Sequence, residues 1–246
     1  MATKKLDRVV IGTRPSPLAL RQAELVQEAL LRADSSLAIK ISPIRTTGDK
    51  LKTGSLAEVG GKGLFVKEIE EALIAGTIDI AVHSLKDMPT DLPKGLALGA
   101  FLPREDPRDL FISKKYPTLL DLPRGAVVGT GSLRRQAQLK NFRPDLKVTP
   151  LRGNVETRLR KVEAGECDAL ILAVAGLKRL GKHGSIQEFL PTTLMLPAVG
   201  QGAIAVEIRR PDDPARSDDP VQSIVHSLND HETAVCVRAE DRKSVV

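Results

Sequence analysis

The residues best suited to chemistry lie in the stretch 81–89, where an apolar strand over 78–82 gives way to Ser84, Lys86 and Asp87. Open α/β sheets bind their ligands at the carboxyl ends of strands. A hydroxyl, an ammonium and a carboxylate here therefore predict a binding or catalytic site, with a polar loop of no function as the alternative. Because Met88 and Pro89 follow Asp87, we expect the backbone around Asp87 to be extended rather than helical.

Basic and hydroxyl side chains recur at the strand-to-helix turns of both halves of the chain. They are Arg14, Ser16, Lys62, Ser84 and Lys86 in the first half, and Thr130, Ser132, Arg134, Arg135, Arg152 and Arg158 in the second. Arginine pairs bidentately with carboxylates and phosphates, so the set favours a ligand that bears several carboxylates. Asp87 is the one acid among these bases, which favour its ionised form. Arg160 and Arg179, on helix flanks, are expected to be solvated surface charges.

The composition argues against several other kinds of site. A net charge of +6 suggests an anionic partner. With one Tyr, five Phe and no Trp, the chain lacks the aromatic side chains that usually stack on single-stranded nucleic acid. Cys167, Cys236 and four scattered histidines form no disulfide framework and no metal-ligand cluster. We expect both cysteines to be buried structural thiols.

Known nucleotide-binding and acyl-transfer motifs are also missing. The glycine-rich segment 60–63, which contains Lys62, lacks P-loop spacing, and it is either an anion-binding loop or a surface hairpin. The run 129–131 lacks the third glycine of a dinucleotide fingerprint. No Ser-His-Asp or Cys-His pairing supports acyl transfer. No signal peptide is visible, and the longest apolar run, 169–175, is too short to span a membrane.

The elements that must position these residues occur twice. In the first half, a strand at 9–12 leads through Ser16 as N-cap and Pro17 into a helix, then a strand at 39–41, a helix that contains Phe65 and ends near Gly76, and the strand 78–82. In the second half the strands 127–129, 146–149 and 169–173 alternate with helices at 133–139 and 155–164. The sequence thus predicts two similar α/β lobes that bind a ligand in the cleft between them.

The remaining segments connect these lobes or follow them. A strand at 96–101 precedes a charged crossover at 103–109, and a return crossover at 196–206 ends in a strand of the first lobe. A polar loop covers 209–220, a helical pattern covers 221–240, and 241–246 shows no clear element.

Several of these motifs together resemble hydroxymethylbilane synthase, also called porphobilinogen deaminase. The matching motifs are 13–20, 60–67, 81–89, 104–109, 129–136, 151–155, 173–181 and 196–203. The resemblance implies α/β lobes of the periplasmic-binding-protein kind with an interlobe cleft, plus a small third α/β domain. It also implies a transferase of heme and porphyrin biosynthesis that joins four porphobilinogen units head to tail, releasing ammonia, to give the linear tetrapyrrole hydroxymethylbilane.

The resemblance assigns roles to residues. Asp87, Lys86 and Arg14 would be catalytic, with Asp87 stabilising the cationic azafulvene. A dipyrromethane cofactor would be bound by Ser84, Lys86, Asp87, Thr130, Ser132, Arg134 and Arg135. The substrate would be bound by Arg14, Ser16, Lys62, Phe65, Arg152, Arg158 and Gln201. No metal is implied. We expect a cytoplasmic monomer that acts on porphobilinogen, with no nucleic-acid or membrane partner.

The chain departs from the family pattern after Glu240. The family attaches its cofactor to a cysteine in a Gly-Gly-Cys-Gln-like loop beyond an Arg-Ala-Glu pattern, here 238–240, and neither Cys167 nor Cys236 matches it. Gly131 stands where the family commonly has Ser. We expect lobe 1 at 1–103 and 200–220, lobe 2 at 104–199, and the start of a truncated third domain at 221–246. Such a chain would bind no cofactor covalently and have little activity, and normal turnover of porphobilinogen would refute this.

Two other classes of protein remain open at this point. A two-lobed binding module for a small polycarboxylate would share the architecture without catalysis, and it would not need Asp87. A nucleic-acid binder would show an affinity that falls steeply with salt.

Overall fold

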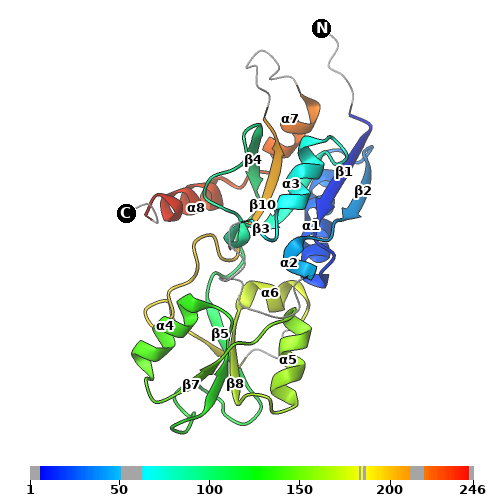
Figure 1. Cartoon of the computed structure of the whole chain (residues 1–246). Helices are drawn as coiled ribbons and strands as arrows, with labels where there is room; N and C mark the ends of the chain where they lie inside the picture. The colour runs from blue at the N-terminus through cyan, green and yellow to red at the C-terminus, as the bar shows by residue number, and fades with distance from the viewer. Residues whose placement is uncertain (1–5, 51–62, 183, 185–186, 211–218, 244–246) are drawn as a thin grey trace. The chain divides into compact units, whose positions relative to one another are not determined.

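The computed structural model describes residues 6–50, 63–182, 184, 187–210 and 219–243. It divides into two compact units (Figure 1). Unit 1 comprises Met1–Arg104 and Ala203–Val246, and unit 2 comprises Glu105–Gly202. Unit 1 is therefore built from two separate lengths of chain. It includes the residues after 220, which the sequence suggests as the start of a third domain, and that assignment to a separate domain stays a prediction.

Unit 1 is built on a five-stranded sheet with the order β2-β1-β3-β10-β4. The strands are β1 (Arg8–Thr13), β2 (Ala38–Pro43), β3 (Ile80–Ser84), β4 (Leu96–Phe101) and β10 (Ile204–Arg209). β1 runs parallel to β2 and β3, whereas β10 lies antiparallel between β3 and β4. As a result, the carboxyl ends of β1, β2 and β3 share one edge of the sheet.

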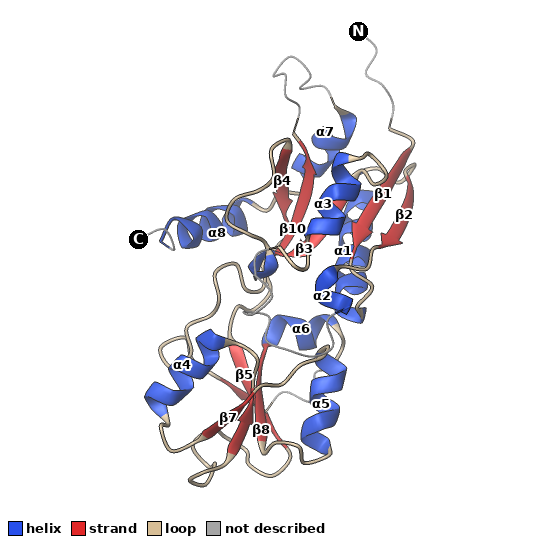
Figure 2. Cartoon of the chain, viewed as in Figure 1, coloured by secondary structure: helices blue, strands red, loops and turns tan. Residues whose placement is uncertain are grey.

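Helices cover both faces of this sheet (Figure 2). On one face α1 (Pro17–Ala33) and α7 (Pro220–Ser227) pack against a core that includes Ile11 and Val82. On the other face lie α3 (Lys67–Ile74) and α8 (His231–Lys243). α1 begins where the sequence predicts, because the Ser16 Oγ accepts a hydrogen bond from the backbone N–H of Ala19 at 3.3 Å.

Unit 2 repeats this plan with the order β7-β6-β8-β5-β9. Its strands are β5 (Asp109–Ser113), β6 (Val127–Gly129), β7 (Lys147–Thr149), β8 (Ala169–Ala173) and β9 (Glu188–Phe189). β6 is parallel to β7 and β8, and β5 is antiparallel to β8. Helix α4 (Leu133–Phe142) covers one face, while α5 (Val155–Glu163) and α6 (Val174–Arg179) cover the other. The predicted fold class, two similar α/β lobes, is confirmed.

The backbone differs from the sequence expectations at several points. Asp87 lies in a single 3-10 turn, η1 (Leu85–Asp87), so the expected extended conformation was wrong. The extended conformation begins after Asp87, at Met88, the residue directly before Pro89, with φ −76° and ψ 143°. Phe65 precedes α3 instead of lying within it. The helical pattern over 221–240 is two helices, α7 and α8, and α8 continues to Lys243.

Some predicted features lie outside the described residues. These are Lys62 with the glycines at 60 and 61, and most of the polar loop at 209–220.

A polar group of three side chains lies in the core of unit 1. The His83 Nε2 is 3.0 Å from the Oε2 of Glu207, and Glu207 has no exposed surface. Glu70, on α3, is 7 % exposed. Burial, and then the nearby Glu207 carboxylate, raise the pKa of Glu70, against a smaller opposing effect of His83. The ionised form of Glu70 is thus disfavoured in the folded protein.

This gives a prediction for stability against pH. Because the folded-state pKa of Glu70 is raised, the folded protein binds its proton more tightly, and stability falls as pH rises above the unfolded value of 4.5. Glu70→Gln removes the ionisable carboxyl group and with it this loss of stability at high pH. We expect the variant to unfold at higher urea than the wild type at pH 8, with the gain absent at pH 4.

Glu71→Gln is the matched control. Glu71 lies one position further along α3, and its side chain is 62 % exposed. Equal effects of the two substitutions at both pH values would contradict the assignment.

Candidate functional site

A pocket lies in unit 1 at the edge where β1 and β3 end. Its lining comes from the turn between β1 and α1, from the first turns of α1, from Phe65 and Val66 before α3, and from β3 and η1. Its polar side chains include those of Arg14, Ser16, Gln22, Ser84 and Asp87, and the Phe65 ring also lines the pocket. The structure thus brings together five of the residues that the sequence predicts for the site: Arg14, Ser16, Phe65, Ser84 and Asp87.

Arg14 is fixed within the pocket by two neighbours. Its Nε lies 3.1 Å from the Oδ1 of Asp49, and its Nη2 also contacts that oxygen. The guanidinium carbon lies 4.2 Å from the centroid of the Phe65 ring, which is a cation–π distance. Arg14 therefore keeps a defined orientation, and Phe65, predicted to bind substrate, contacts Arg14.

Ser84 has a partner that the sequence analysis missed. The Gln22 Nε2 donates to the Ser84 Oγ at 2.8 Å, and the Ser84 hydroxyl lies 3.1 Å from the Gln22 Oε1. Gln22 is 3 % exposed, on the face of α1 that packs against the sheet. A glutamine at a buried helical position, among Ala19, Ala23 and Val26, is the signal that could have identified it.

Asp87 and Lys86 share η1 but differ in their surroundings. Both residues are exposed, and Asp87 lines the pocket. Lys86 is absent from the pocket lining in the described part of the chain. Its predicted catalytic and cofactor-binding roles stay predictions.

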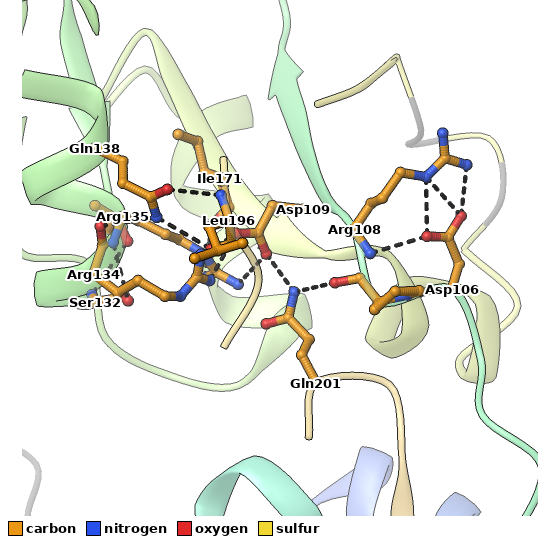
Figure 3. Close-up of polar contacts among 12 residues, drawn as sticks. Asp106, Arg108, Asp109, Ser132, Arg134, Arg135, Gln138, Ile171, Leu196 and Gln201 are labelled. Atoms are coloured by element: carbon orange, nitrogen blue, oxygen red, sulfur yellow. Dashed lines mark hydrogen bonds and ion pairs between the residues drawn. The ribbon is translucent and has the colours of Figure 1, made fainter. Parts of the chain in front are cut away.

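A second cluster, in unit 2, surrounds the fully buried carboxylate of Asp109 (Figure 3). The Nη2 of Arg134 lies 2.7 Å from Oδ2, and the Nη2 of Arg135 lies 2.8 Å from Oδ1. The Gln201 Nε2 donates to Oδ1 at 2.8 Å and is 2.6 Å from the carbonyl oxygen of Pro107. We call Asp109, Arg134, Arg135 and Gln201 the Asp109 cluster. Three of its members are predicted ligand-binding residues.

The cluster is an ion pair in a low-dielectric surrounding. Burial raises the pKa of Asp109, but the charges and hydrogen bonds of Arg135 and Arg134 outweigh it and lower the pKa below its ordinary value. Arg135 is 6 % exposed and also donates from Nη1 to the carbonyl oxygen of Ile171 at 3.1 Å. Arg134 additionally contacts the carbonyl oxygen of Leu196. Both arginines therefore use several of their N–H donors in hydrogen bonds within the protein.

Of the other predicted residues of unit 2, Thr130, Ser132 and Arg152 lie outside helices and strands, and Arg158 lies on a helix. The Ser132 Oγ caps α4 by accepting from the N–H of Arg135 at 3.4 Å, and the Thr130 Oγ1 accepts from the N–H of Ser132 at 3.2 Å. A Cβ at Gly131 would lie 3.4 Å from the carbonyl oxygen of Leu151, so the loop that contains Arg152 adjoins this turn. Arg158 lies on α5. The binding roles predicted for Thr130, Ser132, Arg152 and Arg158 stay predictions.

Arg179 is not the solvated charge that the sequence suggests. It is partly buried at the end of α6, and its Nη2 donates to the carbonyl oxygen of Gly202 at 2.6 Å. Burial lowers the pKa of Arg179 to about 10, against an opposing effect of the Glu105 carboxylate. Arg160 is exposed, as expected.

The two cysteines differ in burial. Cys167 is buried in the core of unit 2, as expected, and burial raises the pKa of its thiol. Cys236 is exposed, so the expectation of a buried thiol was wrong there. α8 turns Ala234 and Val237 toward the sheet, and Cys236 lies off that face.

Two kinds of feature are absent from the part of the chain that the structure describes. The described residues contain no helix long and apolar enough to cross a membrane. They also contain no group of three or more His, Cys, Asp or Glu side chains placed to bind a metal ion.

Two mixed sheets of this order define a two-lobed α/β class that solved structures share. The methionine-binding protein MetQ matches with a TM-score of 0.55 at 13% identity, over 96% of this chain and 95% of its own. A periplasmic substrate-binding protein of an ABC transporter from Coxiella burnetii matches with a TM-score of 0.53 at 14% identity, over 94% and 96%. At such low identity the likeness concerns the fold alone.

The sequence comparisons narrow this class to one family. Residues 9–217 match the family model described as "Porphobilinogen deaminase, dipyromethane cofactor binding domain". The porphobilinogen deaminase of Nitrobacter winogradskyi is 57% identical over 94% of this chain and 72% of its own length, and that of Nitrobacter hamburgensis is 56% identical over the same shares. The chain therefore belongs to the porphobilinogen deaminase family. The resemblance, the enzyme class and the dipyrromethane cofactor expected from the sequence are confirmed.

The Asp109 cluster gives a prediction for stability. Asp109→Asn leaves two arginines without their buried counter-charge, so we expect the free energy of unfolding to fall by about 3–5 kcal/mol. Chemical denaturation monitored by circular dichroism measures this. Glu163→Gln, which removes the exposed partner of Lys114, is the control and should change stability by less than about 1 kcal/mol. Equal losses of unfolding free energy in the two variants would show that the Asp109 cluster stabilises the fold no more than an exposed ion pair does.

The same cluster predicts a step in acid unfolding. Because the folded-state pKa of Asp109 is lowered, its contribution is complete above the unfolded value of 3.8 and is lost as pH falls through the folded value. Wild-type stability should therefore decline below about pH 4. Asp109→Asn should lack this component of the decline, which a urea titration at each pH would reveal.

Proposed function

We propose that this chain joins four porphobilinogen molecules head to tail, releasing four molecules of ammonia and taking up one of water, to give hydroxymethylbilane. Family membership supports the reaction. The observation in the structure that carries the proposal is the lining of the unit 1 pocket, where Asp87 lies among Arg14, Ser16 and Ser84. Such a pocket offers one acid for a developing cation and several donors for carboxylates.

The side chains of the pocket suit the carboxylates of porphobilinogen. Its acetate and propionate groups are anionic at neutral pH and accept hydrogen bonds from guanidinium and hydroxyl groups. We assign Arg14, Ser16 and Ser84 to carboxylate binding, with Phe65 as an apolar wall. Arg152 and Arg158, predicted from the sequence, are further candidates in unit 2.

Asp87 acts at the reacting carbon. When the bond from the aminomethyl carbon to nitrogen breaks, ammonia leaves and positive charge develops over the pyrrole ring and its N–H. A carboxylate at hydrogen-bonding distance from this N–H lowers the energy of that cation. The carbon then bonds to a free α-carbon of another pyrrole, whose ring proton is lost. We assign to Asp87 the role of accepting or passing that proton.

The pocket partly fits a dipyrromethane group. Its carboxylates suit the same donors as those of the substrate, and Ser84, Arg14 and Asp87 would contact it. When bound, the group supplies the pyrrole carbon to which the first substrate is joined. A thioether attachment does not fit the described cysteines, because Cys167 is buried in unit 2 and neither Cys167 nor Cys236 lines the pocket. No step is assigned to a thiol of this chain, and the low turnover expected from the sequence stays a prediction that a rate assay of the wild-type chain would test.

A binding module without catalysis is the second candidate, supported by the fold that the chain shares with solute-binding proteins. The pocket residue that separates the two is Asp87, which a carboxylate-binding module would not need. The cytoplasmic location, the monomeric state and the absence of a nucleic-acid partner are further proposals, made from the sequence alone.

Asp87→Asn tests the function. Since the substitution removes the negative charge but keeps the shape, we expect kcat for porphobilinogen consumption to fall by about a hundredfold or more. Affinity for porphobilinogen, measured by calorimetry, should change by less than about threefold, because other residues bind its carboxylates.

Asp91→Asn is the control, since Asp91 is exposed four residues further on and lies outside the pocket lining in the described residues. Asp91→Asn should leave both kcat and the affinity for porphobilinogen unchanged. Wild-type protein that binds porphobilinogen but releases no ammonia would favour the binding module.

A further inference from the structure

Asp49 is the direct partner of Arg14, a pocket residue. Its carboxylate lies along one edge of the guanidinium, with Nε at 3.1 Å from Oδ1 and 3.4 Å from Oδ2, and Nη2 also in contact with Oδ1. The side chains of Arg14 and Asp49 are 25% and 16% exposed. The pair is therefore partly shielded from solvent but still reaches the pocket surface.

Asp49 is itself held rigidly. The backbone N–H and the hydroxyl of Thr46 donate to its Oδ2 at 3.2 and 2.9 Å, and Thr46 is fully buried. Burial raises the pKa of Asp49, but Arg14 and Thr46 outweigh it and lower the pKa below its ordinary value. The carboxylate is thus ionised at neutral pH and hydrogen-bonded to both Thr46 and Arg14.

The short helix α2 (Thr47–Lys50), which contains Asp49, is anchored to the start of α3. The N–H of Thr47 donates to the Glu68 Oε1 at 2.7 Å, and the N–H of Gly48 donates to the carbonyl oxygen of Leu64 at 2.8 Å. A Cβ at Gly48 would lie 2.2 Å from a ring atom of Phe65. Glycine here allows the Phe65 ring to lie against α2, where it also covers Arg14.

The contacts of Arg14 differ from those of a purely structural arginine. Arg143 pairs with Asp145 through the same edge, Nε and Nη2, each at 2.8 Å. Its Nη1 and Nη2 also donate to carbonyl oxygens of the 119–122 segment. Within the described residues, the hydrogen bonds of Arg14 go to Asp49 alone. A guanidinium has five N–H groups, so the Nη1 edge of Arg14 still has donors to offer.

We propose that Asp49 is a positioning residue, which directs the Nη1 edge of Arg14 toward a carboxylate of the ligand in the unit 1 pocket. Asp49 also offsets the positive charge of Arg14. The ligand would therefore be bound mainly by two oriented N–H donors of Arg14, and less by an uncompensated positive charge. The ligand would be a pyrrole carboxylate, and in this respect the inference rests on the proposed function. Orientation then contributes to rate more than to affinity.

Asp49→Asn in the full chain tests this, with Asp145→Asn as the matched control. In Asp49→Asn, the Arg14 side chain should lose its fixed orientation while the pocket gains positive charge. We expect kcat for porphobilinogen to fall about tenfold and KM to stay level or fall. In the Arg14→Ala background, Asp49→Asn should have no further effect on kcat, because it acts through Arg14. Asp145→Asn should leave kcat and KM within about twofold.

A second readout does not depend on turnover. The NMR signal of the Arg14 Nε–H, assigned with Arg14→Lys, should exchange slowly with water in the wild type and quickly in Asp49→Asn. Asp49→Ser, which removes the charge but keeps an acceptor for Thr46, serves as the second variant if Asp49→Asn unfolds.

The outcomes separate the two proposals. Wild-type protein that neither binds nor consumes porphobilinogen overturns the proposed function and, with it, the ligand that Asp49 would serve. If the wild type is active, the Asp49 proposal alone is overturned by a raised KM with unchanged kcat, or by unchanged exchange of the Arg14 Nε–H.

Discussion

The buried charge of Asp109 is the constraint on which unit 2 depends. A carboxylate without solvent contact is stable only when positive charge and hydrogen bonds replace its hydration, and here Arg134, Arg135 and Gln201 do so. These partners come from α4 and from the chain that leaves unit 2 near Gly202. The Asp109 carboxylate therefore connects three segments of unit 2: β5, where the chain enters, the helix α4, and the segment by which the chain leaves. Residues that resemble a ligand-binding set also stabilise the fold.

The two units reach the same architecture by different routes. Across each sheet, three parallel strands lie side by side, and an antiparallel strand pairs with the last of them: β10 with β3 in unit 1 and β5 with β8 in unit 2. In unit 2 this strand is the first to be made, on the chain entering from unit 1, and in unit 1 it is the last, on the chain returning. Equivalent loops at the carboxyl ends of the parallel strands contain the hydroxyl and basic side chains in both units.

The sequence predicts what local chemistry determines. Ser16 and Ser132 cap the helices as their types suggest, and the apolar strands β1, β3 and β8 are found where expected. It does not predict effects that depend on distant partners. From the sequence, Asp109 is one more charged residue in a charged crossover, because the partners that surround it lie 25 to 92 positions away along the chain. Arg179 and Gln22 were missed for the same reason, whereas Asp87 was misjudged because the proline restriction reaches only Met88.

The insertion of β10 between β3 and β4 has a consequence for the order in which the chain folds. β3 meets β10 through pairs such as His83 with Ala205, more than a hundred residues apart, so the sheet of unit 1 stays open until the ribosome has released residues 204–209. Unit 2 is one continuous length and is complete before that. The nascent chain therefore exposes the unpaired edge of β3, directly before Ser84 and Asp87, throughout synthesis of unit 2. The strand that leads into the pocket therefore keeps an open edge until the last strand of its sheet has been made.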